Sequence, residues 1–186
     1  MGLARDRLLT AAATAFYDNG VHATGIDAIT AAAGVAKKSL YNNFTSKAEL
    51  VHAYIDARHE AWLRLHEACS AQAQTPADRV LAVFDAYIEH AKDAHGNGFR
   101  GCGLLNAAAE FPAGAPERVA VRRHKEQVEA MLAEALAELA DAEAARAGAE
   151  HLSFLLEGAV ARAGLEGTPG RLERARTVAA SIVADL

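Results

Sequence analysis

Cysteine, proline and lysine are all scarce in this chain of 186 residues. The two cysteines, Cys69 and Cys102, form neither a metal-binding pair nor a disulfide framework. Only four prolines interrupt the chain, which leaves room for long helices. No run of 18 apolar residues occurs, and the N-terminus lacks the apolar core of a signal peptide. These absences exclude a disulfide-rich secreted domain and a helical membrane protein, and we expect a cytoplasmic protein.

Motifs for catalysis and metal binding are also missing. The sequence contains neither Gly-x-Ser-x-Gly nor His-Glu-x-x-His, and Cys102 with His124 is the only conceivable catalytic dyad. His52, His59 and His66 recur every seven residues, but two helical turns separate neighbours by about 10.5 Å, too far to share one ion. Cys102 is expected to pack as a small buried residue. We therefore expect no metal, no cofactor and no enzymatic activity.

The most informative segment runs from residue 26 to residue 44. Its apolar residues recur at helical spacing on both sides of Gly34, a residue suited to a tight turn. The positions expected to face inward are Ile26, Ile29, Ala32, Ala33, Val35, Leu40 and Phe44. The positions outside this stripe are Lys37, Lys38, Ser39, Tyr41 and Asn42. The pattern predicts a helix-turn-helix whose second helix enters the major groove of DNA, although a helical hairpin without DNA is the alternative.

The flanks of this segment strengthen the prediction. Upstream, apolar residues from Leu8 to Phe16 predict an amphipathic helix that ends at Asn19-Gly20. Downstream, Ser46-Lys47-Ala48-Glu49 has the form of a capping box, which predicts the start of a long helix. A lysine in the first turn of that helix suits a phosphate contact.

Residues 5 to about 55, with the string TGIDAITAAAGVAKKSLYNNFTSKAEL, resemble the N-terminal domain of the tetracycline-repressor (TetR) family of bacterial transcription regulators. The resemblance implies an all-α fold of about nine helices. Residues 1–46 would form the DNA-binding domain, and residues 47–186 a helical domain for ligand binding and dimerisation. It also implies a homodimer, usually a repressor, whose affinity for its operator changes when a small molecule binds.

Individual roles follow from matching positions in the family motif. Tyr41 and Lys47 match residues that contact the phosphate backbone, and Thr24 matches a position whose hydroxyl often does so. The variable positions that read bases are matched by Lys37, Lys38, Ser39 and Asn42. Gly25 stands where a second hydroxyl is common, Ala36 where serine is common, and Asn42 where histidine or tyrosine is frequent. Gly25 retains a backbone N–H for phosphate, so we expect altered phosphate contacts but not lost binding.

Charge is divided unevenly along the chain. The net charge is −5, yet residues 1–50 carry +1 and the remainder carries −6. Lys37, Lys38 and Lys47 are three of only five lysines. We expect weak non-specific DNA binding and a marked salt dependence of binding. The alternative is that these lysines are ordinary solvated surface residues without a role at DNA.

The remainder of the chain is expected to form helices near residues 47–73, 77–94, 104–110, 117–140, 142–165 and 170–185, with a loop at 95–98. A ligand cavity among the middle helices, for a lipophilic or amphipathic molecule, is expected to be lined by Trp62, Phe84, Tyr87, Ile88, His90, Asn106, Glu110, Phe111 and Phe154. The alternative is that these aromatic residues form plain core.

The last two helices are expected to form the dimer as a four-helix bundle. The predicted contact residues are Leu152, Leu155, Leu156, Gly158, Ala159, Ala163, Val178 and Ile182. Packing of this stripe within its own subunit is the alternative. Two-fold symmetry would predict a palindromic operator. The sequence leaves open the effector, the regulated genes, activation instead of repression, and a helical interaction protein that reads no DNA.

Overall fold

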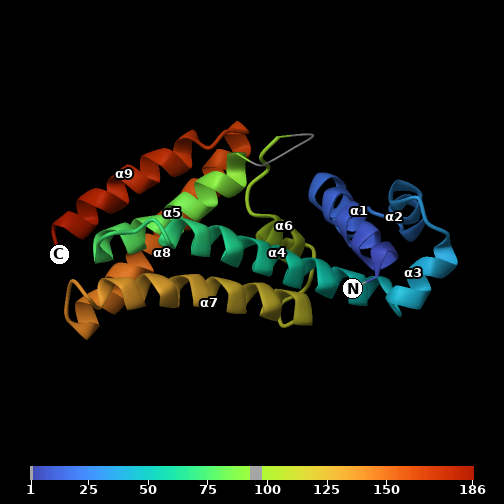
Figure 1. The fold of residues 1–186 in the computed structure, drawn as a ribbon, viewed down its shortest axis with the longest axis horizontal. Coiled ribbons are helices and arrows are strands. Elements are labelled where there is room, and N and C mark those ends of the chain that lie inside the picture. Colours follow the sequence, from blue (N-terminus) through green and yellow to red (C-terminus); the bar gives the residue numbers. More distant parts are fainter. Residues whose placement is uncertain (1, 93–97) are drawn as a thin grey trace. The chain divides into compact units, whose positions relative to one another are not determined.

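The computed structural model describes residues 2–92 and 98–186, and within these ranges all regular structure is helical. The nine described helices are α1 (Leu3–Asn19), α2 (Ile26–Ala33), α3 (Lys37–Asn43), α4 (Lys47–Ser70), α5 (Pro76–Lys92), α6 (Gly103–Ala109), α7 (Pro116–Leu136), α8 (Ala142–Glu166) and α9 (Gly170–Ala184) (Figure 1). The predicted all-α fold is confirmed. The loop expected at 95–98 falls, apart from Gly98, outside the described residues.

Helix α7 ends earlier than the sequence pattern predicts, and local hydrogen bonds give the reason. Helix α7 stops at Leu136, not 140, because the chain tightens: the amides of Leu139 and Ala140 both donate to the Leu136 carbonyl. This turn brings Asp141 to the N-cap of α8, where its carboxylate accepts from the amides of Glu143 and Ala144.

The chain divides into two compact units. The first comprises Met1–His59 and Gly103–Val121, and the second comprises Glu60–Cys102 and Arg122–Leu186. The first unit therefore includes α6 as well as the predicted DNA-binding helices. In it, α1 contacts α2, α3 and α6 (Figure 1). The side chains of Leu8, Ala12 and Phe16 on α1 are buried.

The second unit contains the helices predicted for dimerisation. Helix α9 packs along both α5 and α8 (Figure 1). Its buried residues are Leu172, Ala175, Ala179 and Val183, spaced three or four apart on one face. On the adjoining side, the Arg176 guanidinium makes two hydrogen bonds to the Asp85 carboxylate of α5, at 2.6 and 3.0 Å.

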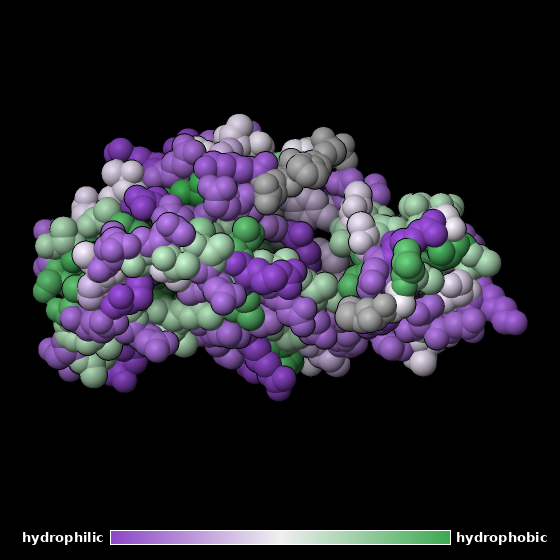
Figure 2. Space-filling model, in the orientation of Figure 1, coloured by the Kyte–Doolittle hydropathy of each residue, from purple (hydrophilic) through white to green (hydrophobic). Residues whose placement is uncertain are grey.

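Hydrophilic residues cover most of the face seen in Figure 2, and hydrophobic residues occupy separate smaller areas. Among the described residues, no helix combines the length and the apolar character needed to cross a membrane.

Candidate nucleic-acid interface and sensor core

The turn between α2 and α3 has the geometry that its sequence predicts. Gly34 adopts a left-handed conformation, with φ 61° and ψ 42°. Its amide donates to the Ala31 carbonyl and the Val35 amide donates to the Thr30 carbonyl, which ends α2. Beyond the turn, Leu40 and Phe44 are completely buried. The structure thus contains the predicted pair of short helices with the second one anchored by its apolar side.

Helix α3 presents four polar side chains to solvent, which we call the recognition face: Lys37, Lys38, Tyr41 and Asn42. Tyr41 is 50% exposed. Ser39 is half-buried and lies between this face and the core side. The recognition face offers ammonium, phenol and amide groups, which suit phosphate oxygens and base edges.

Lys37 is paired within residues 1–46, which we call the head. Its Nζ lies 2.8 Å from the Asp27 carboxylate at the start of α2, and both side chains are largely exposed. This hydrogen bond raises the pKa of Lys37. Asp27 therefore places a negative charge beside the recognition face and engages one of its cations.

Asp27→Asn should tighten DNA binding, because it removes a repulsive charge and leaves Lys37 available to the DNA. We expect about a threefold gain at low salt that shrinks as salt is raised, since exposed charges are screened. Fluorescence anisotropy with a labelled operator measures this. Asp185→Asn, an exposed change in the second unit, is the control. Equal or weaker binding by Asp27→Asn would contradict a role for Lys37 at the DNA.

Lys47 stands at the first position of α4, after a cap that differs partly from the predicted box. The Ser46 hydroxyl accepts the Glu49 amide at 3.1 Å, as predicted. The Glu49 carboxylate, however, accepts from the amide and hydroxyl of Thr45, at 2.6 and 2.7 Å, and not from Ser46. The Lys47 ammonium donates to the His22 carbonyl at 3.5 Å, a long contact that leaves capacity for phosphate.

The structure corrects the role predicted for Thr24. Its side chain is buried, with 4% exposure. Its hydroxyl lies 2.6 Å from the Gly20 carbonyl and 3.1 Å from that of Ala15. The single hydroxyl proton is therefore used within the head and is not available to DNA. Gly25 is exposed at the N-cap of α2, where no side chain caps the helix.

Glu110 is also placed differently from the prediction. Its carboxylate accepts the amides of Val21 and His22, at 2.6 and 2.7 Å, and lies 3.2 Å from the His22 imidazole. Burial opposes the charged form, but these backbone donors lower the pKa of Glu110 overall. Glu110 thus joins the end of α6 to the loop before α2, which corrects its assignment to a ligand cavity.

Two further residues predicted for the cavity lie with Glu110 in the first unit. The Phe111 ring packs 5.2 Å from the His22 ring. Asn106 is exposed on α6. Asn106, Glu110 and Phe111 therefore belong to the first unit, whereas the predicted aromatic residues Trp62, Phe84 and Tyr87 belong to the second.

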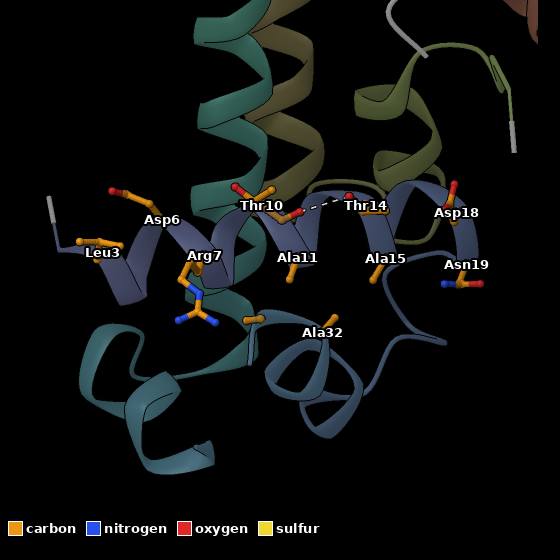
Figure 3. Close-up of a pocket in the computed structure, with 11 residues that line it drawn as sticks. Leu3, Asp6, Arg7, Thr10, Ala11, Thr14, Ala15, Asp18, Asn19 and Ala32 are labelled. Carbon is orange, nitrogen blue, oxygen red and sulfur yellow. Dashed lines mark hydrogen bonds between the residues drawn. The ribbon is translucent and has the colours of Figure 1, made fainter. Parts of the chain in front are cut away.

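An open groove of 710 Å³ runs between α1 and α2 in the first unit (Figure 3). Small side chains, including Ala11, Ala15 and Ala32, line it, and Arg7 spans it to donate to the Gly34 carbonyl at 3.3 Å. None of the residues predicted for the ligand cavity lines this groove.

Four of the predicted cavity residues are buried in the second unit: Trp62, Phe84, Tyr87 and Ile88. The rings of Trp62 and Tyr87 lie 5.3 Å apart. His90 is half-buried, with its ring 6.4 Å from that of Phe99. Phe154, by contrast, is 65% exposed on α8, so its assignment to an interior cavity is corrected.

Lys125 and Glu157, which were not predicted from the sequence, form an ion pair next to Tyr87. Lys125 donates to the Tyr87 hydroxyl at 3.1 Å and pairs with the Glu157 carboxylate at 2.6 Å. His124 is buried with its ring against the edge of Trp62, at 5.4 Å. The spacing of Lys125 and Glu157 on α7 and α8 is that of ordinary exposed charged residues, so nothing in the sequence indicated this pair. Only in the structure is Lys125 seen to be half-buried. Within the described ranges, no cluster of three histidine, cysteine or acidic side chains could hold a metal ion.

The predicted dimer stripe is split in two by the structure. The protomer itself buries Leu152, Leu156, Ala159 and Ala163 completely or nearly so. These side chains have little area left to contribute to a partner, so they are corrected from dimer contacts to core. Gly158 and Val178 are exposed, and Leu155 and Ile182 are half-buried.

Comparison with known proteins agrees with this architecture. Residues 8–54 match the family described as bacterial regulatory proteins, tetR family, and residues 76–179 match the tetracyclin repressor-like C-terminal domain. A crystal structure of a TetR-family transcriptional regulator from Streptomyces coelicolor is 32% identical, with a TM-score of 0.88, covering 98% of this chain and 95% of that one.

Curated relatives match mainly through the head. The activator FasR of Mycolicibacterium smegmatis is 49% identical over 55 residues, which are 30% of this chain and 25% of that protein. The repressor KstR2 of the same species is 31% identical over 91 residues, 49% of this chain and 44% of that protein. The matches thus span less than half the length of these curated relatives. Together, the helix-turn-helix head, the helical second unit and both domain matches show that this chain belongs to the TetR family of bacterial transcription regulators, a family of DNA-binding proteins that are not enzymes.

Proposed function

We propose that the protein is a homodimeric repressor that binds a palindromic operator and is released by a small molecule. The observation that supports this most directly is the recognition face, with Tyr41 half exposed on a helix whose other side is buried. In this proposal Lys37, Lys38, Ser39 and Asn42 read bases, while Tyr41, Lys47 and the Gly25 amide contact phosphate. The protein then acts where the chromosome is, in the cytoplasm.

The sign of regulation is part of the proposal. Of the two curated relatives described above, FasR is named an activator and KstR2 a repressor. We favour repression because the match to KstR2 covers more of this chain. A helical interaction protein that reads no DNA is the alternative, and footprinting distinguishes the two.

The functional division we propose places DNA binding in residues 1–46 and effector binding with dimerisation in residues 47–186. The helix that carries Lys47 begins at this boundary and continues to Ser70. Residues on both sides of the boundary thus share one continuous backbone, through which binding of an effector can change the position of the head.

A dimer surface on α8 and α9 is supported by exposed apolar side chains of the second unit. Phe154 is 65% exposed and Val178 is 37% exposed. Large apolar groups gathered at a surface are typical of protein interfaces. We propose that Phe154, Leu155, Gly158, Val178 and Ile182 form this dimer surface. Two-fold symmetry would then place the two recognition helices roughly 34–36 Å apart, one turn of DNA.

Phe154→Glu should convert the dimer to a monomer, because an isolated carboxylate would be buried at the interface. Sedimentation velocity should show the mass halved, and operator affinity should fall with it. Circular dichroism should be unchanged, since Phe154 is exposed in the protomer. Leu105→Glu, at a 40% exposed leucine of α6, is the control and should leave the mass unchanged. A dimeric Phe154→Glu protein would refute the proposed surface.

The direct test of function is footprinting on the DNA that flanks the gene, at two salt concentrations, followed by selection from random DNA. A protected palindrome supports the regulator. Failure to enrich any sequence by selection would favour the interaction protein.

A further inference from the structure

Two buried polar atoms of the second unit have no hydrogen-bond partner within the part of the chain that the structure describes. They are the indole Nε1 of Trp62 and the carboxylate Oε2 of Glu157. Trp62 is only 4% exposed. Leaving a buried donor or acceptor unsatisfied is unfavourable, so such atoms are retained where something else binds them.

Both atoms belong to one connected group of side chains, which we call the polar core: Trp62, Tyr87, Lys125 and Glu157. The Trp62 ring lies 5.3 Å from the Tyr87 ring. The Tyr87 hydroxyl accepts from Lys125 at 3.1 Å, and Lys125 pairs with the other oxygen of Glu157 at 2.6 Å. Helices α4, α5, α7 and α8 each contribute one residue. The unsatisfied donor and the unsatisfied acceptor therefore lie at the two ends of one chain of contacts.

The charges of the polar core are already compensated. Burial opposes the charged form of Lys125, but the neighbouring Cys102, Tyr87 and Glu157 raise its pKa overall, so the ammonium balances the carboxylate. Burial raises the pKa of Tyr87, which stays a neutral phenol. Burial also lowers the pKa of His66, whose ring stacks on Trp62 at 5.4 Å. A charged ligand would add an unbalanced charge here, whereas a neutral one would not.

We propose that the polar core is the recognition end of the effector site, and that it selects a neutral, flat aromatic molecule carrying a hydroxyl group. Trp62 Nε1 offers a donor to a ligand oxygen, and Glu157 Oε2 offers an acceptor to a ligand hydroxyl proton. The aromatic body packs against the outer side of the ring cluster that Trp62 forms with Tyr87 and His124. This inference rests on the proposed function for its regulatory meaning. It narrows the lipophilic or amphipathic ligand expected from the sequence to one that has both a hydrogen-bond donor and an acceptor.

Trp62 is the only tryptophan of the chain, so its fluorescence reports on this site. The test uses four probes on the full-length protein: 4-propylphenol, 4-propylanisole, propylbenzene and 4-propylbenzoate. Only the phenol is neutral and can both donate and accept. We expect it to change Trp62 emission saturably and to bind at least about tenfold more tightly than propylbenzene, as two added hydrogen bonds predict. The anisole and the benzoate should bind more weakly than the phenol.

Variants connect this preference to the two atoms. Glu157→Gln and Trp62→Phe, measured by calorimetry, should each reduce the preference for phenol over propylbenzene by about fivefold, the effect of one hydrogen bond. Glu150→Gln, an exposed change on the same helix, is the control and should retain it. Circular dichroism establishes that each variant is folded, and the two substitutions are independent, so a failure of one to fold leaves the other.

The outcomes separate this inference from the proposed function. Equal affinity for the phenol and propylbenzene, or a preference unaffected by both variants, would overturn the inference and indicate that buried water satisfies the two atoms. DNA binding measured without probe tests the proposed function alone. A phenol preference in a protein that binds no DNA would sustain the site and refute the regulator.

Discussion

Replacing both Tyr41 and Lys47 by alanine should weaken binding to the operator by about 10- to 100-fold, with similar losses on every DNA sequence tested. The reason is that phosphate contacts position the protein without reading bases. Lys47 has one long hydrogen bond in the head, to the His22 carbonyl, and Tyr41 is half exposed. Removing one lysine contact should also lower the slope of log affinity against log salt by about 0.9. Anisotropy titrations at several salt concentrations measure both quantities.

Two control variants make this result specific. Lys92→Ala removes a lysine that pairs with Glu89 in the second unit and should leave DNA affinity unchanged. Tyr41→Phe keeps the ring and removes only the hydroxyl, so it should recover part of the loss if the ring packs against the sugar-phosphate backbone. A loss confined to one DNA sequence would mean that Tyr41 or Lys47 reads a base. An unchanged affinity would remove both from the interface.

Gly164→Ala should destabilise the second unit by about 2 kcal/mol or more, which lowers the melting temperature by roughly 4–8 °C in a chain of this size. A Cβ at this position of α8 would lie 2.5 Å from the amide nitrogen of Gly101 and 2.7 Å from its Cα. It would also lie 2.8 Å from the carbonyl carbon of Arg100. All three are backbone atoms, which cannot rotate away as a side chain can. Thermal unfolding followed by circular dichroism measures the change.

The matched control is Gly148→Ala on the same helix. Its Cβ would meet only the flexible end of the Leu136 side chain, at 3.2 Å. Alanine is favoured over glycine inside a helix by about 1 kcal/mol, so this variant should be neutral or more stable. Equal melting temperatures for the two variants would contradict the close contact between α8 and the Gly101 loop.

The predictions that were wrong for individual residues have a common physical reason. Thr24 and Glu110 bind backbone groups in the head, and nothing in the local sequence shows that their side chains are already engaged. Phe154 was assigned to a cavity because aromatic residues are often buried, yet it lies on the exposed side of α8. Helical periodicity establishes that a residue shares a stripe with others, but not which neighbour covers that stripe.

Short-range patterns were sufficient for the family, the helix-turn-helix, the turn at Gly34 and the order of helices, because these depend on spacing within one or two helical turns. Contacts between distant segments were not accessible in this way. Lys125 meets Tyr87 across 38 positions of the chain, and Glu110 meets Val21 across 89. Tertiary packing alone decided that Trp62, Tyr87, Lys125 and Glu157 converge and that Leu152 and Leu156 belong to the core, since burial depends on which helices lie together in space.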